Sequence, residues 1–319
     1  MIYLVSHPAD LHATTVLGHL EKMGEPVRLL DMSEFPQQRK LTIAYENPSA
    51  PTLSLSNGSP ESWDLGATTS VWWRRPQAFE LPEMANSEIH SFTYNEWQEA
   101  VSGLWQLLPG LWINDPVRDQ VAARKAYQLR EAAIAGLRVP RTLITSDPDQ
   151  ARAFIKALGM DNTVYKVFSA TQHSWRETRV LRQVELAFLD SLELAPVIFQ
   201  ECIHADIDLR ITVIGDKVFP ASIRSVEGTY KVDFRMEMDN ASIEPVKLPK
   251  KIETRLLKLM RRLGLVYGAI DMRLTEEGEY VFLEINTAGQ WLFVEYETEQ
   301  PIARALAELL ASPASSNIH

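Results

Sequence analysis

The pattern of hydrophobic and polar positions is clearest between Tyr267 and Asn286, where two apolar runs flank a turn at Glu276-Glu277-Gly278. Runs of this length, YGAIDMR and YVFLEIN, with a short glycine-containing connection predict two strands paired as a hairpin. Asp271, Glu284 and Asn286 interrupt or end these runs. Because an unpaired buried carboxylate is costly, we expect the three side chains to converge on one point.

The N-terminal pattern predicts a parallel sheet. Residues 2–6 and 27–30 have the composition of strands, and residues 9–23 between them have amphipathic helical spacing. The chain has neither a GxGxxG fingerprint nor a GxxxxGKS/T loop. Neither a Rossmann dinucleotide site nor a P-loop is therefore predicted.

Residues 70–76, SVWWRRP, predict a strand of β-branched and aromatic residues that ends in Arg74 and Arg75. These arginines either bring positive charge to a cleft at the carboxyl end of the strand or form a solvated strand end. The pattern is compatible with both interpretations.

A turn and helix start at Asp115-Pro116 marks the expected end of the first lobe. We expect one helix from about residue 117 to residue 135, with Gly136 as its stop. A strand is predicted over residues 138–145, and a helix capped by Ser146 or Asp147 follows it.

Lys166 interrupts a short apolar strand at residues 164–168. A lysine there either extends to the edge of the sheet or binds phosphate, and the acidic hairpin favours phosphate binding. The polar stretch at residues 169–179 predicts a loop that closes over a triphosphate or is an exposed turn. His173 within it is expected to be solvated.

Strands are also predicted over residues 196–204, 206–215 and 217–224, with a turn at Gly215-Asp216 between the last two. Asp208 and Arg210 share one face because side chains alternate along a strand. Arg224, on the partner strand, is expected to point the same way as Arg210.

The acidic hairpin predicts a metal site. Asp271, Glu284 and Asn286 provide hard oxygen ligands that suit Mg²⁺, which leaves further coordination positions for water and phosphate. These residues predict a nucleotide-dependent phosphoryl-transfer site. The alternative is that the carboxylates are polar strand residues that face solvent.

Composition narrows the class of protein. With 319 residues, 45% of them hydrophobic, the chain can bury a substantial core in two or three lobes. Cys202 is the single cysteine, which excludes a disulfide framework and a multi-cysteine zinc site and favours the cytoplasm. The net charge of −10 argues against nucleic acid as the main partner. We expect neither export nor membrane insertion, because no signal peptide and no bilayer-length apolar run is present.

Several of these features carry a resemblance to a known family. In chain order they are Lys166, the strand end QECI at 200–203, Asp208-Leu-Arg210, Asp271 and Glu284-Ile-Asn286. Over essentially the whole chain this order resembles the ATP-grasp carboxylate ligases. Three segments narrow the resemblance to the macrocyclases of graspetide biosynthesis, the microviridin type: WWRRP at 72–76, RVPRTLIT at 138–145 and GQWLFVE at 289–295.

The resemblance implies a mixed α+β and α/β architecture, the ATP-grasp fold, in three parts. Residues 1–115 would form an N-terminal pre-ATP-grasp domain. Residues 116–195 would form a central ATP-grasp subdomain with the phosphate lid, and residues 196–319 a C-terminal subdomain with the metal site.

The resemblance also implies roles for individual side chains. Lys125 and Lys166 would contact the ATP phosphates, although Lys125 can instead be an exposed helix position. Adenine, and ribose or substrate, would be bound by the strand end and the residues after it: Gln200, Glu201, Cys202, Ile203, and Asp206 or Asp208. Magnesium would be held by Asp271, Glu284 and Asn286, and the γ-phosphate or acyl phosphate by Arg210, Arg224 and Arg273.

As such a macrocyclase, the chain would use ATP and Mg²⁺ to activate Asp or Glu side chains of a ribosomally made precursor peptide as acyl phosphates. Thr or Ser hydroxyls, or Lys amines, of the same leader-bearing peptide would then close ester or amide rings. The general base stays open among His173, Asp208 and Glu295. A homodimer is expected, and the apolar stripe of the helix predicted at residues 87–108 faces the core or a dimer partner.

Three alternatives stay open. The first is an ATP-grasp ligase that joins an amino acid to a small amine or a protein carboxylate, as in glutamate ligation. The second is a nucleotide-binding module without chemistry, against which the complete lysine, arginine and metal set argues. The third is an α+β protein outside the ATP-grasp family.

Overall fold

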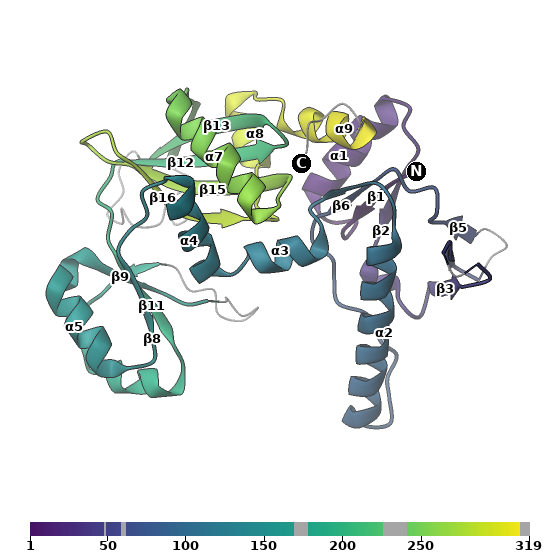
Figure 1. Ribbon diagram of the computed structural model, residues 1–319, viewed down its shortest axis with the longest axis horizontal. Helices are drawn as coiled ribbons and strands as arrows, with labels where there is room; N and C mark the ends of the chain where they lie inside the picture. The colour runs from purple at the N-terminus through teal and green to yellow at the C-terminus, as the bar shows by residue number, and fades with distance from the viewer. Residues whose placement is uncertain (48, 59–61, 169–177, 226–240, 313–319) are drawn as a thin grey trace.

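In the computed structural model, the described residues are 1–47, 49–58, 62–168, 178–225 and 241–312. Their helices and strands form three groups that lie side by side (Figure 1). Among the described residues, none of the helices combines the length and the hydropathy needed to span a bilayer.

The first group is built on a parallel sheet, which confirms the N-terminal prediction. In the order β2-β1-β6-β7, it contains β1 (Ile2–Val5), β2 (Val27–Leu30), β6 (Ser70–Trp73) and β7 (Leu111–Ile113). Helix α1 (Leu11–Lys22) begins at Asp10, whose carboxylate accepts hydrogen bonds from the first N–H groups of the helix. After the turn η1 (Met32–Glu34), an antiparallel sheet adds β3 (Lys40–Ala44), β4 (Thr52–Ser56) and β5 (Ser62–Asp64).

Helix α2 (Ser87–Leu107) projects away from this group (Figure 1). Its C-terminal part buries Val101, Leu104 and Trp105, whereas Phe92 exposes 65% of its surface. The predicted apolar stripe therefore reaches the core from Trp97 onward, since Trp97 also packs against the buried Phe35. Contact of the remaining turns with a partner subunit stays a prediction.

The prediction of a single helix from residue 117 to residue 135 is wrong. The chain forms α3 (Pro116–Ala122) and α4 (Lys125–Ala135), and Arg124 between them is extended. The buried Gln128 amide donates hydrogen bonds to the carbonyl oxygens of Ala122 at 2.7 Å and Ile285 at 2.8 Å. This long-range contact holds the break open and places Lys125 at the start of α4. The predicted stop at Gly136, with φ of 94°, is confirmed.

The second group is an antiparallel sheet in the order β10-β9-β11-β8, covered by helix α5. It contains β8 (Thr142–Thr145), α5 (Pro148–Leu158), η2 (Met160–Asn162), β9 (Thr163–Lys166), β10 (Arg179–Val180), α6 (Gln183–Leu186), η3 (Leu189–Leu194) and β11 (Val197–Glu201). The Asp147 cap of α5 is confirmed. The strand expected from residue 138 begins only at Thr142, because Arg138 instead bridges Val281 of the neighbouring sheet.

The third group is an antiparallel sheet in the order β14-β13-β12-β15-β16. It contains β12 (Ile207–Ile214), β13 (Lys217–Ser225), β14 (Ala241–Pro245), β15 (Tyr267–Leu274) and β16 (Tyr280–Asn286), followed by α8 (Leu292–Thr298) and α9 (Ile302–Ala311). The predicted hairpin of β15 and β16 is confirmed. Helix α7 (Lys250–Leu263) packs on one face, against residues such as Leu209, Ile211 and Ile270. The opposite face carries the polar side chains, including Arg210 and Asp271.

The expected orientation of Arg224 is wrong. Arg210 lies directly opposite Ala221 in the ladder of β12 and β13, so these two residues share a face. Arg224 is three positions further along the strand and therefore projects from the opposite face, where it is exposed. The predicted turn at Gly215-Asp216 already sets this register, and the expectation failed on the alternation of side chains along β13.

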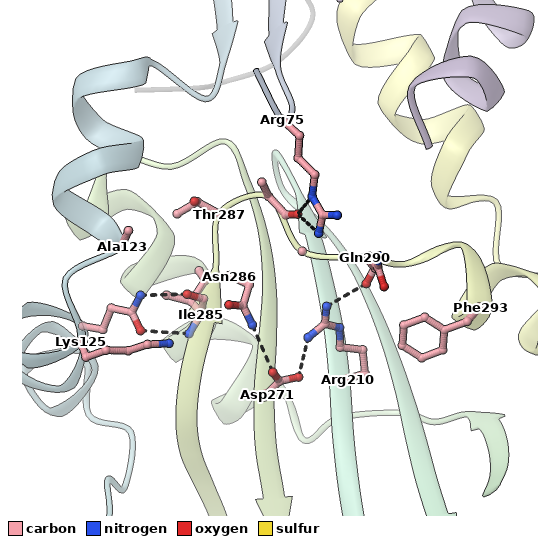
Figure 2. A pocket seen from close by; sticks show the side chains of 13 residues that line it. Arg75, Ala123, Lys125, Arg210, Asp271, Ile285, Asn286, Thr287, Gln290 and Phe293 are labelled. Carbon is pink, nitrogen blue, oxygen red and sulfur yellow. Dashed lines mark hydrogen bonds and ion pairs between the residues drawn. The ribbon is translucent and has the colours of Figure 1, made fainter. Parts of the chain in front are cut away.

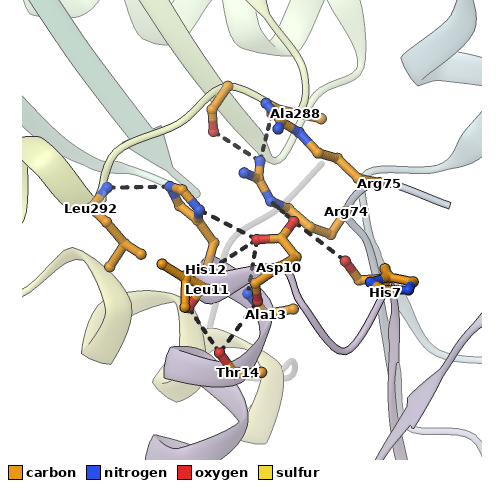
Figure 3. Close-up of polar contacts among 12 residues, drawn as sticks. His7, Asp10, Leu11, His12, Ala13, Thr14, Arg74, Arg75, Ala288 and Leu292 are labelled. Carbon is orange, nitrogen blue, oxygen red and sulfur yellow. Dashed lines mark hydrogen bonds and ion pairs between the residues drawn. The ribbon is translucent and has the colours of Figure 1, made fainter. Parts of the chain in front are cut away.

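The first and third groups share a core and a polar junction (Figure 3). Arg74 is only 1% exposed, and its Nε donates to Asp10 Oδ2 at 3.2 Å. The ring of His12 lies with Nδ1 3.3 Å from Asp10 Oδ1. Its Nε2 accepts hydrogen bonds from the backbone N–H groups of Trp291 and Leu292.

This junction predicts acid sensitivity. Burial lowers the pKa of His12 from its usual 6.5, and Asp10 offsets this only in part. Burial also raises the pKa of Asp10, but the hydrogen bonds from His12 and the charge of Arg74 outweigh it, so that this pKa lies well below the usual 3.8. Both groups therefore take up protons more readily in the unfolded chain. The free energy of unfolding is expected to fall as the pH drops below 6.5 through His12, and again below 3.8 through Asp10.

Urea denaturation over a series of pH values checks this expectation. In His12→Gln, the loss of stability that begins near pH 6.5 is expected to flatten, because the titrating ring is gone. His90→Gln, on the exposed part of α2, is the matched control. An unchanged slope in His12→Gln would show that another group is responsible.

Candidate active site

A cavity of about 880 Å³ opens where the ends of β15 and β16 meet helix α4 and the loop after β16 (Figure 2). Its lining includes Lys125, Arg210, Asp271 and Asn286, all of which the sequence analysis singled out. Arg75 of the first lobe also lines it. The cavity therefore lies between the two lobes that share the core.

The three predicted metal ligands lie together, and two of them, Asp271 and Asn286, line this cavity. Asp271 and Glu284 face each other in the ladder of β15 and β16. The amide nitrogen of Asn286 lies 3.3 Å from Asp271 Oδ2 and 3.3 Å from Glu284 Oε1. Because the two ends of an amide are assigned from their surroundings, a turned amide presents its oxygen to the same point. Two carboxylates and one amide oxygen fit Mg²⁺.

Arg210 is the best-anchored cation at the cavity. Its Nη1 donates to Asp271 Oδ1 at 2.7 Å and its Nη2 to the carbonyl oxygen of Gln290 at 2.8 Å (Figure 2). Burial lowers the pKa of Arg210, but the adjacent Asp271 carboxylate outweighs it and the net shift is upward. Arg210 therefore stays charged.

Gly289 permits this approach between loop and arginine. A Cβ at residue 289 would lie 2.4 Å from the Cβ of Ala269 and 2.9 Å from Arg210 Nη2. Any side chain there would displace the loop or the guanidinium. Close packing therefore explains why the first residue of the GQWLFVE segment is a glycine.

Lys125 forms an ion pair with Glu284 at the edge of the cavity. Its side chain is only 27% exposed, so the alternative interpretation of Lys125 as an exposed helix residue is wrong. The break between α3 and α4 brings this lysine to the metal-type residues. A lysine beside an acidic cluster can neutralise phosphate charge as well as carboxylate charge.

A second set of predicted residues gathers around β9 and β11. Lys166 Nζ donates to Gln200 Oε1 at 2.8 Å, and Gln200 Nε2 donates to Thr142 Oγ1 at 3.0 Å. Gln200 is 3% exposed. This pair gives Lys166 a fixed position in the sheet rather than a solvated one.

The strand end after Gln200 is partly occupied by internal contacts. The Glu201 carboxylate accepts the N–H of Arg141 at 3.0 Å. Cys202 N–H donates to Asn162 at 2.8 Å, and the Ile203 carbonyl accepts from Arg273. Two of the four backbone groups expected to meet adenine at Cys202 and Ile203 are therefore already hydrogen-bonded within the protein.

Arg273 and Asp208 form a bidentate ion pair, with N–O distances of 2.8 and 3.2 Å. They face each other two positions along the ladder from Arg210 and Asp271. Arg273, Cys202 and Asp206 line a smaller cavity of about 320 Å³. The structure thus places these residues beside the end of β11 and not beside the predicted metal ligands.

Some residues at the site were missed or left open by sequence reasoning. Arg74 is buried, so the interpretation of this arginine as part of a solvated strand end is wrong. Arg75 lines the cavity. Gln128 and Gln290 contribute to the site through hydrogen bonds to residues distant in sequence. The only sequence feature that could have pointed to Gln128 is a polar residue within an apolar helical stripe. Residues 169–177 of the predicted lid, His173 included, lie outside the described residues.

Family models cover almost the whole chain. Residues 1–120 match the MvdD pre-ATP grasp domain, and residues 122–310 match the RimK-like ATP-grasp domain. The chain belongs to the RimK-like ATP-grasp family. The predicted ATP-grasp fold and the assignment as an ATP-grasp ligase are thereby confirmed. ATP-grasp ligases use ATP and magnesium, the chemistry that the donor set of this cavity fits.

Individual relatives agree with this ATP-grasp assignment. The macrocyclase MdnC bound with precursor peptide MdnA from Microcystis aeruginosa MRC is 28% identical, with a TM-score of 0.85 over 97% of this chain and 98% of that one. A Chryseobacterium gregarium RiPP-associated ATP-grasp ligase in complex with ADP, and a leader and core peptide, is 27% identical, with a TM-score of 0.88 over 100% and 98%. A probable alpha-L-glutamate ligase from Shewanella loihica (strain ATCC BAA-1088 / PV-4) is 25% identical over 68% of this chain and 73% of its own.

Proposed function

We infer that this ATP-grasp ligase closes rings in a ribosomally made precursor peptide, by joining Asp or Glu side chains to Thr or Ser hydroxyls or to Lys amines. The observation that carries this proposal is the match to peptide-bound macrocyclase structures over nearly the whole chain, first lobe included. The glutamate ligase relatives match a shorter part. Homodimerisation and a cytoplasmic location stay predictions.

Space for a peptide supports the same conclusion. A cavity of about 560 Å³ between the first lobe and α8 shares Arg75, Gln290 and Phe293 with the cavity at the predicted metal ligands. Leu11 and Tyr296, which are largely exposed, line it. We propose that the peptide lies in this second cavity and extends its reacting carboxylate past Arg75 toward the nucleotide.

The proposed chemistry has two steps. The γ-phosphoryl group of ATP passes to a peptide carboxylate, which gives an acyl phosphate and ADP. A hydroxyl or amine of the peptide then attacks the acyl carbon and loses its proton, and inorganic phosphate leaves with the bonding electrons. Lys125, Lys166 and Arg210 would neutralise the charge that develops on the transferred group.

Bound at Asp271, Glu284 and Asn286, Mg²⁺ would supply a further charge to the same oxygens. Holding both reacting groups of one peptide raises their effective concentration. Of the candidate bases, Asp208 is held by Arg273, and Glu295 accepts the N–H of Ala303 at 2.7 Å. We assign the base to neither of them.

The decisive experiment follows peptide mass. The protein is incubated with Mg-ATP and a Thr-, Asp- and Glu-rich peptide encoded beside its gene. ATP-dependent losses of one water each are expected, and they should vanish in Asp271→Asn but persist in Asp216→Asn, an exposed residue of the β12–β13 turn. An unchanged peptide, with ATP consumed instead when a free amino acid is supplied, would favour the glutamate ligase function.

Lys166→Met is expected to raise the KM for ATP about tenfold or more, since a hydrogen bond to a charged group contributes about 1.5–3 kcal/mol. The methionine keeps the length of the side chain but removes the charge beside Gln200. Initial rates at varied ATP measure the effect. Lys156→Met, on the exposed side of α5, is the matched control. An unchanged KM for ATP would remove Lys166 from the nucleotide site.

A further inference from the structure

The loop between β16 and α8, residues 287–291, is held from two sides. On the catalytic side, its Gln290 carbonyl accepts a hydrogen bond from Arg210 Nη2 at 2.8 Å (Figure 2). On the other side, Arg74 Nη1 of the first lobe donates to the carbonyl oxygens of Ala288 at 2.5 Å and Gly289 at 2.9 Å (Figure 3). Three consecutive carbonyl oxygens therefore accept hydrogen bonds from two buried arginines of different lobes. Ala288 also accepts from Arg75, and Gly289 also accepts from Tyr267 Oη at 2.7 Å.

His12 fixes the end of the same loop. Its Nε2 accepts hydrogen bonds from the N–H groups of Trp291 at 3.1 Å and Leu292 at 3.3 Å. Nε2 must be unprotonated to accept, so the proton of the neutral ring lies on Nδ1, which faces Asp10 Oδ1. Asp10 also accepts from Arg74 Nε at 3.2 Å and so joins both contacts to the start of α1.

A continuous series of contacts thus leads from Asp10 through His12 and Arg74 to the loop, and from the loop to Arg210. Arg210 in turn donates to Asp271 at 2.7 Å. The Arg210 guanidinium is buried, and within the described residues these two oxygens accept its hydrogen bonds. A shift of the Gln290 carbonyl is therefore expected to move the guanidinium.

We propose that Asp10, His12 and Arg74 are positioning residues, through which the first lobe sets the place of the Arg210 guanidinium for phosphoryl transfer. This inference rests on the proposed catalytic role of Arg210. Because Asp10 and His12 also line the cavity proposed for the peptide, a fall in kcat rather than a rise in the KM for peptide distinguishes positioning from peptide contact. A misplacement of about 1 Å at a reacting group can cost about 100-fold in rate, which makes such a device consequential. The first lobe is then required for the rate of the chemical step as well as for peptide binding.

Four variants of the full chain separate positioning from folding. His12→Phe keeps the packing against Trp291, whose ring centroid lies 5.0 Å away, but removes the acceptor. His12→Gln offers an amide oxygen near the place of Nε2 and does not titrate. Arg74→Lys keeps a charge beside Asp10 but loses the fork that reaches the loop. Arg39→Lys, at an ion-paired arginine of the same lobe, is the control.

In His12→Phe and Arg74→Lys, kcat for peptide cyclisation is expected to fall about 10- to 100-fold, with the KM for ATP within about twofold. His12→Gln should keep most of the wild-type kcat and lose the part of its acid limb that reports the ring. The charged groups that face His12 are Asp10 of its own helix and Arg74 and Arg75 after β6, and α8 offers it only N–H groups.

Folded His12→Phe and Arg74→Lys with kcat within about twofold of wild type would overturn the proposal, as would an effect confined to the KM for peptide. If His12→Phe fails to fold, the kcat of Arg74→Lys and the pH profile of His12→Gln still test the proposal. A crystal structure of Arg74→Lys is a readout independent of activity, and the Arg210 Nη2 to Gln290 distance should lengthen beyond about 3.5 Å. An unchanged distance contradicts positioning, whereas a wild-type chain that cyclises no peptide contradicts only the proposed function.

Discussion

Asp271→Asn is expected to lower kcat for peptide cyclisation at least about 1000-fold, because a bound metal ion contributes several kcal/mol to transition-state stabilisation. Asparagine has nearly the same shape but no charge, and it can present its NH₂ group to the cation. Asp271 is also the carboxylate opposite Glu284 and the partner of Arg210, so the change affects both sides of the proposed site. Single-turnover rates at saturating Mg-ATP measure it.

The same substitution tests stability, which must be separated from catalysis. Asp271 balances the buried charge of Arg210, and removal of one partner of a buried ion pair costs about 3–5 kcal/mol. Glu284→Gln is the matched variant, because Glu284 pairs with the half-buried Lys125 and its loss leaves no buried charge unbalanced. We expect Glu284→Gln to be nearly as inactive as Asp271→Asn but more stable in urea. Normal cyclisation by either variant while folded would exclude the metal site.

Local patterns were sufficient for the elements that carry the proposed metal site. Two apolar runs joined by a glycine turn specify a hairpin, and the costs of burial require its carboxylates to find partners. Asp271, Glu284 and Asn286 therefore came together as predicted. The caps of α1 and α5 are likewise determined by residues adjacent in sequence.

Contacts between distant segments were not predictable in this way. The apolar spacing from residue 117 to residue 135 is continuous and gives no sign of the break, where Gln128 donates hydrogen bonds to Ala122 and to the distant Ile285. The orientation of Arg224, by contrast, follows from the predicted Gly215-Asp216 turn, which sets the register of β12 and β13 and leaves Arg224 an odd number of positions from Ala221. The role of Arg74 became visible only with the loop carbonyls beside it.

Arg210→Lys is expected to lower kcat about 100- to 1000-fold, the usual effect of removing one preorganised donor to a developing charge. The ammonium keeps the charge beside Asp271, so the chain should stay folded. A single nitrogen on a shorter side chain cannot donate to both Asp271 and the Gln290 carbonyl, as the two nitrogens of the guanidinium do. Because ATP would still meet Lys125 and Lys166, the KM for ATP should change much less than kcat.

Arg224→Lys provides the matched comparison, since it makes the same substitution on the neighbouring strand. Arg224 projects from the opposite face of the sheet and is exposed, so its effect should stay within about twofold. Rates of cyclisation and of ADP release for both variants, at saturating peptide, distinguish the two arginines. Equal losses at the two positions would mean that the sheet rearranges when ATP binds, and an active Arg210→Lys would move the phosphate-binding role to the lysines. The register of one ladder therefore decides which of two sequence-predicted arginines carries the chemistry.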